Sequence, residues 1–162
     1  MPQPIIDGFE FARLGREQHG DWPVADLPRL QDVVRSNAGS VAWSVKGVRD
    51  GMGRLALAVE VQGTLALSCQ RCLETLEHRF RSASVLVLAH SEAEADADPV
   101  EVEGPERIVA GPEMPVRDLV EDEVLLALPL AARHERCSGA QDEGRAKTNK
   151  PFAGLKGLLG GH

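Results

Sequence analysis

The sequence predicts an α+β domain, in which a C-terminal helix packs on an antiparallel sheet or a partly closed β-barrel. From residue 41 onward, apolar residues alternate with small or polar ones, as in strands that bury one face. Residues 115–128 instead carry apolar residues at helical spacing. A chain of 162 residues with 43% hydrophobic content has room for one such domain. We expect a single domain over 1–137, then a flexible polar linker and a short apolar and basic tail over 138–162.

The first forty residues give weaker local signals than the rest of the chain. Phe9–Gly15 has the composition of a short strand. Asp26 can cap a helix, and Pro28 fits a first helical turn. The apolar residues that follow at helical spacing are Leu27, Leu30, Val33 and Val34. The sequence therefore predicts an N-terminal strand and a short helix over residues 26–36.

An antiparallel meander is predicted for the central part of the chain. Asp50-Gly51 is a typical hairpin turn between two alternating segments. The apolar positions of these two segments are Val41, Trp43 and Val45, then Leu55, Leu57, Val59 and Val61. Extended character resumes over residues 75–90, so we expect at least three neighbouring strands with one buried face.

The acidic character of the chain is concentrated in one segment. Glu92–Glu113 contains eight acidic residues and a single basic one. Its charge of −7 equals the net charge of the whole chain. Within it, residues 91–99 lack apolar periodicity and the spacing of a calcium loop, which predicts a solvated acidic loop. The rest of the chain is neutral and has no basic stripe of the kind found in independent nucleic-acid binders.

The predicted C-terminal helix has clear boundaries, with Pro115 at its first position and Pro129 at its end. Three consecutive acidic residues lie within it. Because neighbouring helical residues point in different directions, these carboxylates do not converge on a substrate. We expect Glu121 and Asp122 to face solvent, and Glu123 to lie nearer the apolar side with a polar partner.

Two pairs of soft metal ligands suggest a structural zinc site. Cys69 and Cys72 form a C-x-x-C motif at the end of a predicted strand, and His134 and Cys137 follow the helix with the same spacing. Together they offer the four ligands of a tetrahedral Cys3His site. Two alternatives remain open. The thiols could be reduced and packed as small hydrophobic groups, or they could serve redox catalysis, although a thioredoxin-like C-x-x-C opens a helix instead of following antiparallel strands.

No common catalytic motif is present: the chain lacks P-loop, dinucleotide-binding, metalloprotease and nucleophile-elbow patterns. With no Tyr, two Trp and four Phe residues, an aromatic platform for RNA bases is not expected either. Arginines that could contact phosphate lie near the two ligand pairs, at Arg71, Arg79, Arg81, Arg133 and Arg136. In the tail, Phe152, Leu155 and Leu158 could dock on a partner or pack on the domain itself.

The motif CQRCLE, the helix VRDLVEDEVLLALPL and the following ARHERC together resemble the YceD family of bacterial proteins. The segment TNKPFAGLKGLL resembles the short basic segment at the end of many members, although Lys150 stands between Asn149 and Pro151. The resemblance covers most of residues 41–159. By motif, it identifies these family positions: Cys69, Cys72, Glu121, Asp122, Glu123, Pro129, His134 and Cys137.

The resemblance implies a non-enzymatic factor that supports synthesis, processing or stability of 23S rRNA in large ribosomal subunit biogenesis. The implied partners are 23S rRNA or assembly intermediates, reached directly or through another protein. A zinc-containing protein–protein adaptor, or a thiol redox protein, is the alternative. We expect no small-molecule substrate and no membrane association. The odd cysteine count, the C-x-x-C motif and the absence of a secretory signal at the N-terminus favour the reducing cytoplasm.

Overall fold

The structure is a computed structural model that describes residues 3–97 and 104–137. Its main feature is a five-stranded sheet with the order β2-β3-β4-β5-β6. The strands are β2 (Glu17–Pro23), β3 (Ser40–Arg49), β4 (Leu55–Ser68), β5 (Thr75–Ala89) and β6 (Arg107–Val109). Neighbouring strands are antiparallel except for β5 and β6, which are parallel. The sheet is open, with β2 and β6 at its edges, so the predicted α+β class is confirmed and the alternative of a partly closed barrel is not realised.

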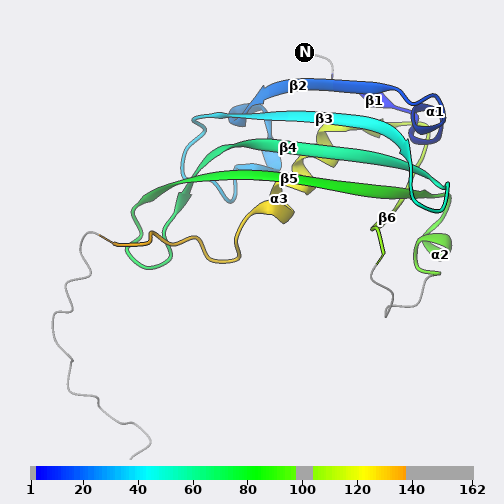
Figure 1. Cartoon of the computed structure of the whole chain (residues 1–162). Coiled ribbons are helices and arrows are strands. Elements are labelled where there is room, and N and C mark those ends of the chain that lie inside the picture. Colours follow the sequence, from blue (N-terminus) through cyan, green and yellow to red (C-terminus); the bar gives the residue numbers. More distant parts are fainter. Residues whose placement is uncertain (1–2, 98–103, 138–162) are drawn as a thin grey trace, which may run out of the picture.

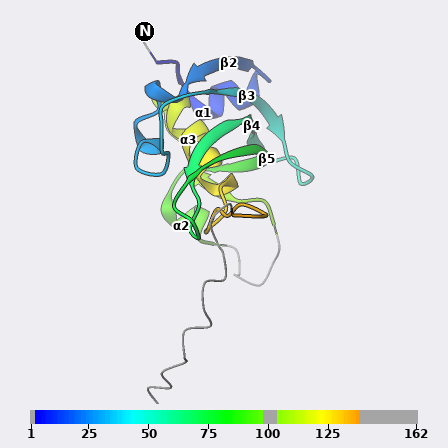
Figure 2. The same cartoon turned by 90° about the vertical axis from the view of Figure 1, so that its left-hand side faces the viewer.

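Helix α3 (Val116–Ala127) lies against the concave face of the curved sheet, and no helix covers the opposite face of the described structure (Figures 1 and 2). This helix agrees closely with the predicted 115–128 segment. Pro115 is its N-cap, and the chain becomes extended at Leu128, immediately before Pro129. A small second sheet joins β1 (Ile5–Ile6) to β7 (Met114–Pro115) and so holds the N-terminus beside the start of α3.

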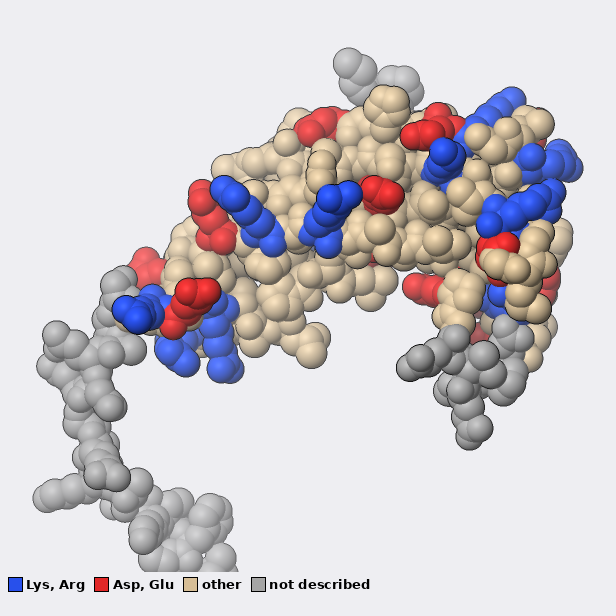
Figure 3. Space-filling model, in the orientation of Figure 1, with Lys and Arg blue, Asp and Glu red and all other residues tan. Residues whose placement is uncertain are grey.

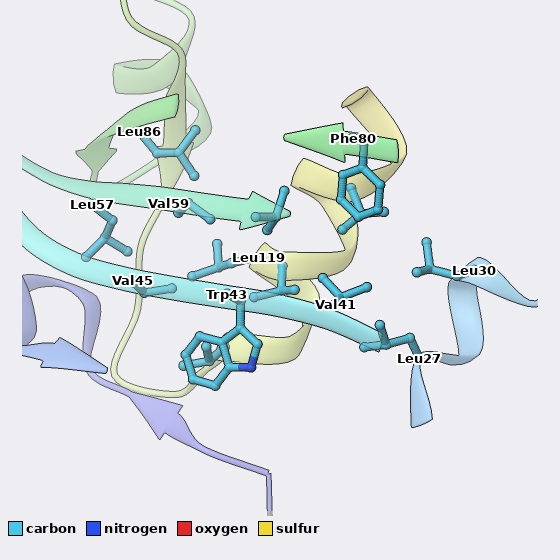
Figure 4. Close-up of a cluster of buried hydrophobic side chains, with 14 of the residues drawn as sticks. Leu27, Leu30, Val41, Trp43, Val45, Leu57, Val59, Phe80, Leu86 and Leu119 are labelled. Atoms are coloured by element: carbon cyan, nitrogen blue, oxygen red, sulfur yellow. The ribbon is translucent and has the colours of Figure 1, made fainter. Parts of the chain in front are cut away.

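Alternating residues of the meander build the core, as the sequence predicted. Val41, Trp43 and Val45 face Gly63, Val61 and Val59 across the β3–β4 ladder. Because directly opposed residues share a face of the sheet, these side chains form one apolar layer under α3. Figure 4 shows this layer. It is completed by Leu119 of α3 and by Leu27 and Leu30, which precede β3 in the chain.

The N-terminal segment differs from its prediction. Phe9–Gly15 was expected to be a strand, but Gly8–Arg13 forms helix α1. The Asp7 side chain accepts a hydrogen bond from the backbone N–H of Glu10 at 2.8 Å, which caps the first turn. Helix α1 approaches the sheet closely at Gly47, where an added Cβ would lie 2.4 Å from the Phe11 carbonyl oxygen. A glycine is required here by packing, not by backbone conformation.

The predicted helix over 26–36 is also wrong. The chain forms two single turns instead, η1 (Val24–Asp26) and η2 (Pro28–Leu30). Leu27 between them is extended, with φ −109° and ψ 88°, because a residue before proline is driven out of the helical region. Both turns still bury their apolar residues, which is why the apolar spacing resembled a helix.

Residues 91–99 were predicted to be a solvated loop, and part of that segment is helical. Ser91 caps the single-turn helix α2 (Glu92–Ala95) by accepting a hydrogen bond from the backbone N–H of Glu94. None of its residues is buried, so the expected solvent exposure holds for this turn.

The acidic run of α3 fixes the helix to two different elements. Glu123 accepts hydrogen bonds from the hydroxyls of Ser82 and Ser84 on β5, each at 2.5 Å. The polar partner expected for Glu123 is therefore confirmed. Glu121 was expected to face solvent, but it is 1% exposed and accepts a hydrogen bond from the backbone N–H of Arg29 at 2.9 Å.

We predict that the Ser82→Ala/Ser84→Ala double variant loses about 3–5 kcal/mol of unfolding free energy, because it leaves the buried Glu123 carboxylate without donors. Adding Glu123→Leu should restore most of the loss, since the site then holds no unpaired charge. Asp122→Ala is the control. It removes only the exposed pair with Arg29, and should cost at most about 1 kcal/mol. Urea denaturation measures all three, and a triple variant no more stable than the double would contradict this account.

Candidate metal centre

The four predicted ligands lie at one end of the sheet, where β4 and β5 continue beyond their neighbours. Strand β3 pairs with β4 only between Leu55 and Gly63, whereas β4 and β5 pair as far as Ser68 and Thr75. The end of this hairpin is thus a two-stranded ribbon, an arrangement that is marginally stable alone. The segment that follows α3 returns to this ribbon, as Figure 1 shows. The site therefore joins the last part of the described chain to an otherwise weakly supported hairpin.

The C-x-x-C motif forms the tip of the hairpin. The backbone N–H of Cys69 donates to the Glu74 carbonyl, and the N–H of Leu73 donates to the Cys69 carbonyl, both at 2.9 Å. Leu73 has a φ of 62°, the left-handed region that side chains other than glycine seldom adopt. Leu73 is also 65% exposed, so packing of its side chain does not hold it there. The turn keeps a strained residue immediately after the second cysteine, as is common at functional sites.

The segment after α3 is attached to the hairpin by backbone contacts. The N–H of Gln70 donates to the carbonyl of Ala132 at 2.8 Å, and the N–H of His134 points at the Cys69 sulfur at 3.4 Å. Pro129 ends the helix and starts the extended path towards the hairpin. These contacts place His134 and Cys137 opposite the C-x-x-C turn.

The ligand atoms have the separations that a tetrahedral zinc ion requires. All four lie within 4.8 Å of one another. Cys69 Sγ is 3.7 Å from Cys137 Sγ, and Zn–S bonds of about 2.3 Å imply a separation of about 3.8 Å. Cys72 Sγ is 3.3 Å from His134 Nδ1, near the roughly 3.6 Å expected for a sulfur and a nitrogen on one zinc ion. The donor set and its dimensions therefore fit zinc.

The orientation of His134 also suits a metal ligand. Its Nε2 lies 3.2 Å from the Thr75 carbonyl oxygen, which can only accept a hydrogen bond. A proton on Nε2 leaves the lone pair of Nδ1 directed at the other ligands. Metal-binding histidines commonly donate their second ring N–H to a backbone carbonyl in this way. The start of β5 thus selects the tautomer that the site needs.

Two of the thiols have pKa values shifted in opposite directions. Backbone N–H groups of Cys72 and His134 point at Cys69 and lower its pKa to about 5, despite its burial. Burial, together with the neighbouring Cys69 and Cys72, raises the pKa of Cys137 to about 11. The surroundings of the cluster thus favour a thiolate at Cys69 and oppose a second thiolate at Cys137 beside it. A divalent cation would remove that conflict, because it stabilises several thiolates at once.

The five predicted arginines are all exposed, but they do not form one ring around the site. Arg71, Arg133 and Arg136 are adjacent in sequence to the ligands. Arg79 and Arg81 lie further along β5, opposite Thr64 and Gln62 on the uncovered face of the sheet. Figure 3 shows basic side chains gathered at the hairpin end and a second group at the opposite end.

Sequence reasoning missed Arg35, which reaches the hairpin from the segment after η2. Its backbone N–H donates to the Ala66 carbonyl at 2.6 Å, and its guanidinium donates to the Ser68 hydroxyl at 3.3 Å. No local motif marks this residue, since its partner Ser68 lies 33 residues away in the sequence. The tail positions Phe152, Leu155 and Leu158 lie outside the described residues.

Comparison with known proteins gives one match. Residues 57–159 match the family described as large ribosomal RNA subunit accumulation protein YceD. This span includes the hairpin, α3 and all four candidate ligands. No curated protein and no solved structure matches the chain. Within the described residues, no helix is long and apolar enough to cross a lipid bilayer.

We predict about one equivalent of zinc in protein purified without chelator, because the four ligand atoms already approach tetrahedral spacing. Cys72→Ser or His134→Ala should weaken zinc binding at least about 100-fold, since removing only a hydrogen-bond partner of a ligand typically costs about 10–100-fold. His78→Ala is the control, because His78 lies on β5 outside the ligand group. Elemental analysis and competition with a chromogenic chelator measure both quantities, and less than about a tenth of an equivalent in the unmodified protein would exclude the site.

Proposed function

Because this chain belongs to the YceD family, we propose that it is a non-enzymatic factor that supports the synthesis, processing or stability of 23S rRNA during assembly of the large ribosomal subunit. The family match carries this proposal, since it spans the hairpin, α3 and the ligand cluster. We propose that the protein acts in the cytoplasm, as a binding module whose partner is 23S rRNA or an assembly intermediate.

In this proposal, the zinc ion has a structural role. It would be held by Cys69, Cys72, His134 and Cys137 and would join the C-x-x-C turn to the segment after α3. All four positions would then be taken by protein, as in structural sites, with none open to substrate. The rigid hairpin end would present its side chains to the partner in a fixed arrangement, which lowers the entropic cost of binding.

The side chains that we propose for phosphate contact are the arginines at this end and along β5. Arg71, Arg133 and Arg136 project from the two segments that the metal would join. Exposed Arg79 and Arg81 extend the basic surface along the uncovered face of the sheet. Arginine binds phosphate in a bidentate manner and fixes the position of a nucleic-acid backbone without reading its sequence. A second protein could also carry the chain to the RNA.

A protein–protein adaptor with the same zinc site is the second candidate. It is favoured by exposed apolar residues near the hairpin end, since Leu73 is 65% exposed and Leu130 is fully exposed. A thiol redox protein is less well supported. Cys69 is the cysteine with the lowered pKa, but it is fully buried, and the C-x-x-C turn lies between antiparallel strands. Reactive thiols need solvent access and usually lie at helix N-termini.

We predict that deletion of this gene in its host selectively lowers the ratio of 23S to 16S rRNA. A copy with Cys72→Ser should fail to restore the ratio, because the hairpin end would lose its metal. A copy with Arg13→Gln/Arg16→Gln, altered at the opposite end of the sheet, should restore it. Quantification of precursor and mature rRNA by gel and hybridisation measures the ratio, and an unchanged ratio after deletion would refute the proposal.

For direct RNA contact, we predict that the Arg71→Gln/Arg133→Gln/Arg136→Gln variant binds a 23S rRNA fragment more weakly than the unmodified protein. Its log Kd should also depend less steeply on log salt, by about 0.7–0.9 for each arginine that no longer neutralises a phosphate. Filter binding at several salt concentrations measures both effects. Equal affinity and equal salt dependence of the variant and the unmodified protein would contradict phosphate contact by these arginines.

A further inference from the structure

A groove of about 590 Å³ lies beside the candidate metal centre. Three parts of the chain form it: the segment after η2, the end of β4 with the hairpin tip, and the end of α3 with the residues that follow. Its lining includes Val33, Arg35, Leu67, Gln70, Leu130 and Ala132. Two of these three parts, the hairpin tip and the residues after α3, are also the parts that the Cys/His cluster joins.

The groove has an apolar floor and an exposed apolar rim. Leu67 and Ala132 are 5% and 8% exposed. On the rim, Val33 is 41% exposed and Leu130 is fully exposed. Large apolar side chains that surround a concave surface are typical of binding grooves. The described part of the chain leaves this surface uncovered, and so it is available to a further apolar segment.

We propose that residues 151–159 of the same chain bind in this groove. Phe152, Leu155 and Leu158 recur at a spacing of three in the sequence, so this segment offers large apolar side chains at regular intervals. Their large apolar side chains match the apolar floor and rim. The described chain ends at Cys137, close in sequence to Ala132, which itself lines the groove.

The connection is long enough for the tail to reach the groove. Thirteen residues separate Cys137 from Pro151, and the fully extended connection between these two residues spans about 45–50 Å. Treated as a flexible linker, it has a root-mean-square span of about 20 Å, which gives an effective concentration in the millimolar range. At micromolar protein concentrations, this tether favours the tail of the same chain over that of a second copy.

Docking would also complete a basic surface at the hairpin end. Between residues 145 and 156 the tail carries Arg145, Lys147, Lys150 and Lys156 and no acidic residue. A tail bound in the groove brings these cations to Arg35 and to the arginines beside the metal ligands. In this proposal, docking would join the cations of the tail to those of the hairpin end in one basic surface. This consequence for RNA rests on the proposed function, whereas the docking itself does not.

Backbone hydrogen exchange of the full chain, followed by mass spectrometry, tests the docking without RNA. The Phe152→Ala/Leu155→Ala/Leu158→Ala variant should exchange at least about fivefold faster over residues 32–35 and 128–132. Val33→Glu, which places a charge on the groove rim, should have the same effect. Val85→Glu is the matched control: Val85 is 39% exposed, close to the 41% of Val33, but lies on the opposite face of the sheet. It should leave exchange in the groove unchanged.

A synthetic peptide of residues 149–162 should restore protection to the tail variant when added in excess, and should fail to do so when Val33→Glu is also present. Equal exchange over the groove in the unmodified protein and the tail variant would overturn the proposal. Protection of the groove from hydrogen exchange that falls on dilution of the protein would also overturn the proposal. The groove would then be occupied by the tail of a second copy. Because no RNA is present, an unchanged 23S ratio in the host would refute the proposed function and leave this result untouched.

Discussion

The attachment of the segment after α3 to the β4–β5 hairpin is the constraint on which the candidate metal centre depends. Strands β4 and β5 extend beyond β3, so the ribbon at their end lacks a neighbouring strand on that side. Two-stranded ribbons are marginal in water. The contacts of Gln70 with Ala132 and of His134 with Cys69 and Thr75 supply the missing support. A metal ion would make this attachment rigid.

Helix α3 connects the sheet to that attachment. Its apolar side packs on the core, and two buried carboxylates specify where it packs, with Glu123 held by β5 and Glu121 by η2. A buried carboxylate is costly without its donors, so these contacts disfavour positions of the helix in which the donors would be lost. His134 and Cys137 follow directly from the end of this helix. Its docking therefore sets where two of the four ligands can lie.

The meander, the C-terminal helix and the meeting of the four candidate ligands could be predicted because their signals are local: alternation, helical spacing, proline boundaries and paired Cys and His residues. The N-terminal segment could not be predicted in the same way. Leu27–Pro28 interrupts an apolar pattern of helical spacing, so that two single turns form instead of one helix. A cap by Asp7 starts a helix in Phe9–Gly15, where the composition indicated a strand. The burial of Glu121 and the place of Arg35 depend on contacts with distant segments. The resemblance to the YceD family is confirmed by the match over residues 57–159. It is the basis of the proposed role, which the charge pattern could not indicate.

The most direct test of the metal centre is X-ray absorption at the zinc edge, measured on the full chain after purification without chelator and gel filtration. This account predicts three sulfur neighbours at about 2.3 Å and one nitrogen at about 2.0–2.1 Å, with no water bound to the metal. A spectrum with only oxygen and nitrogen neighbours, or the absence of bound zinc while all three thiols remain reduced, would contradict it. The hairpin end would then be held by its backbone contacts alone.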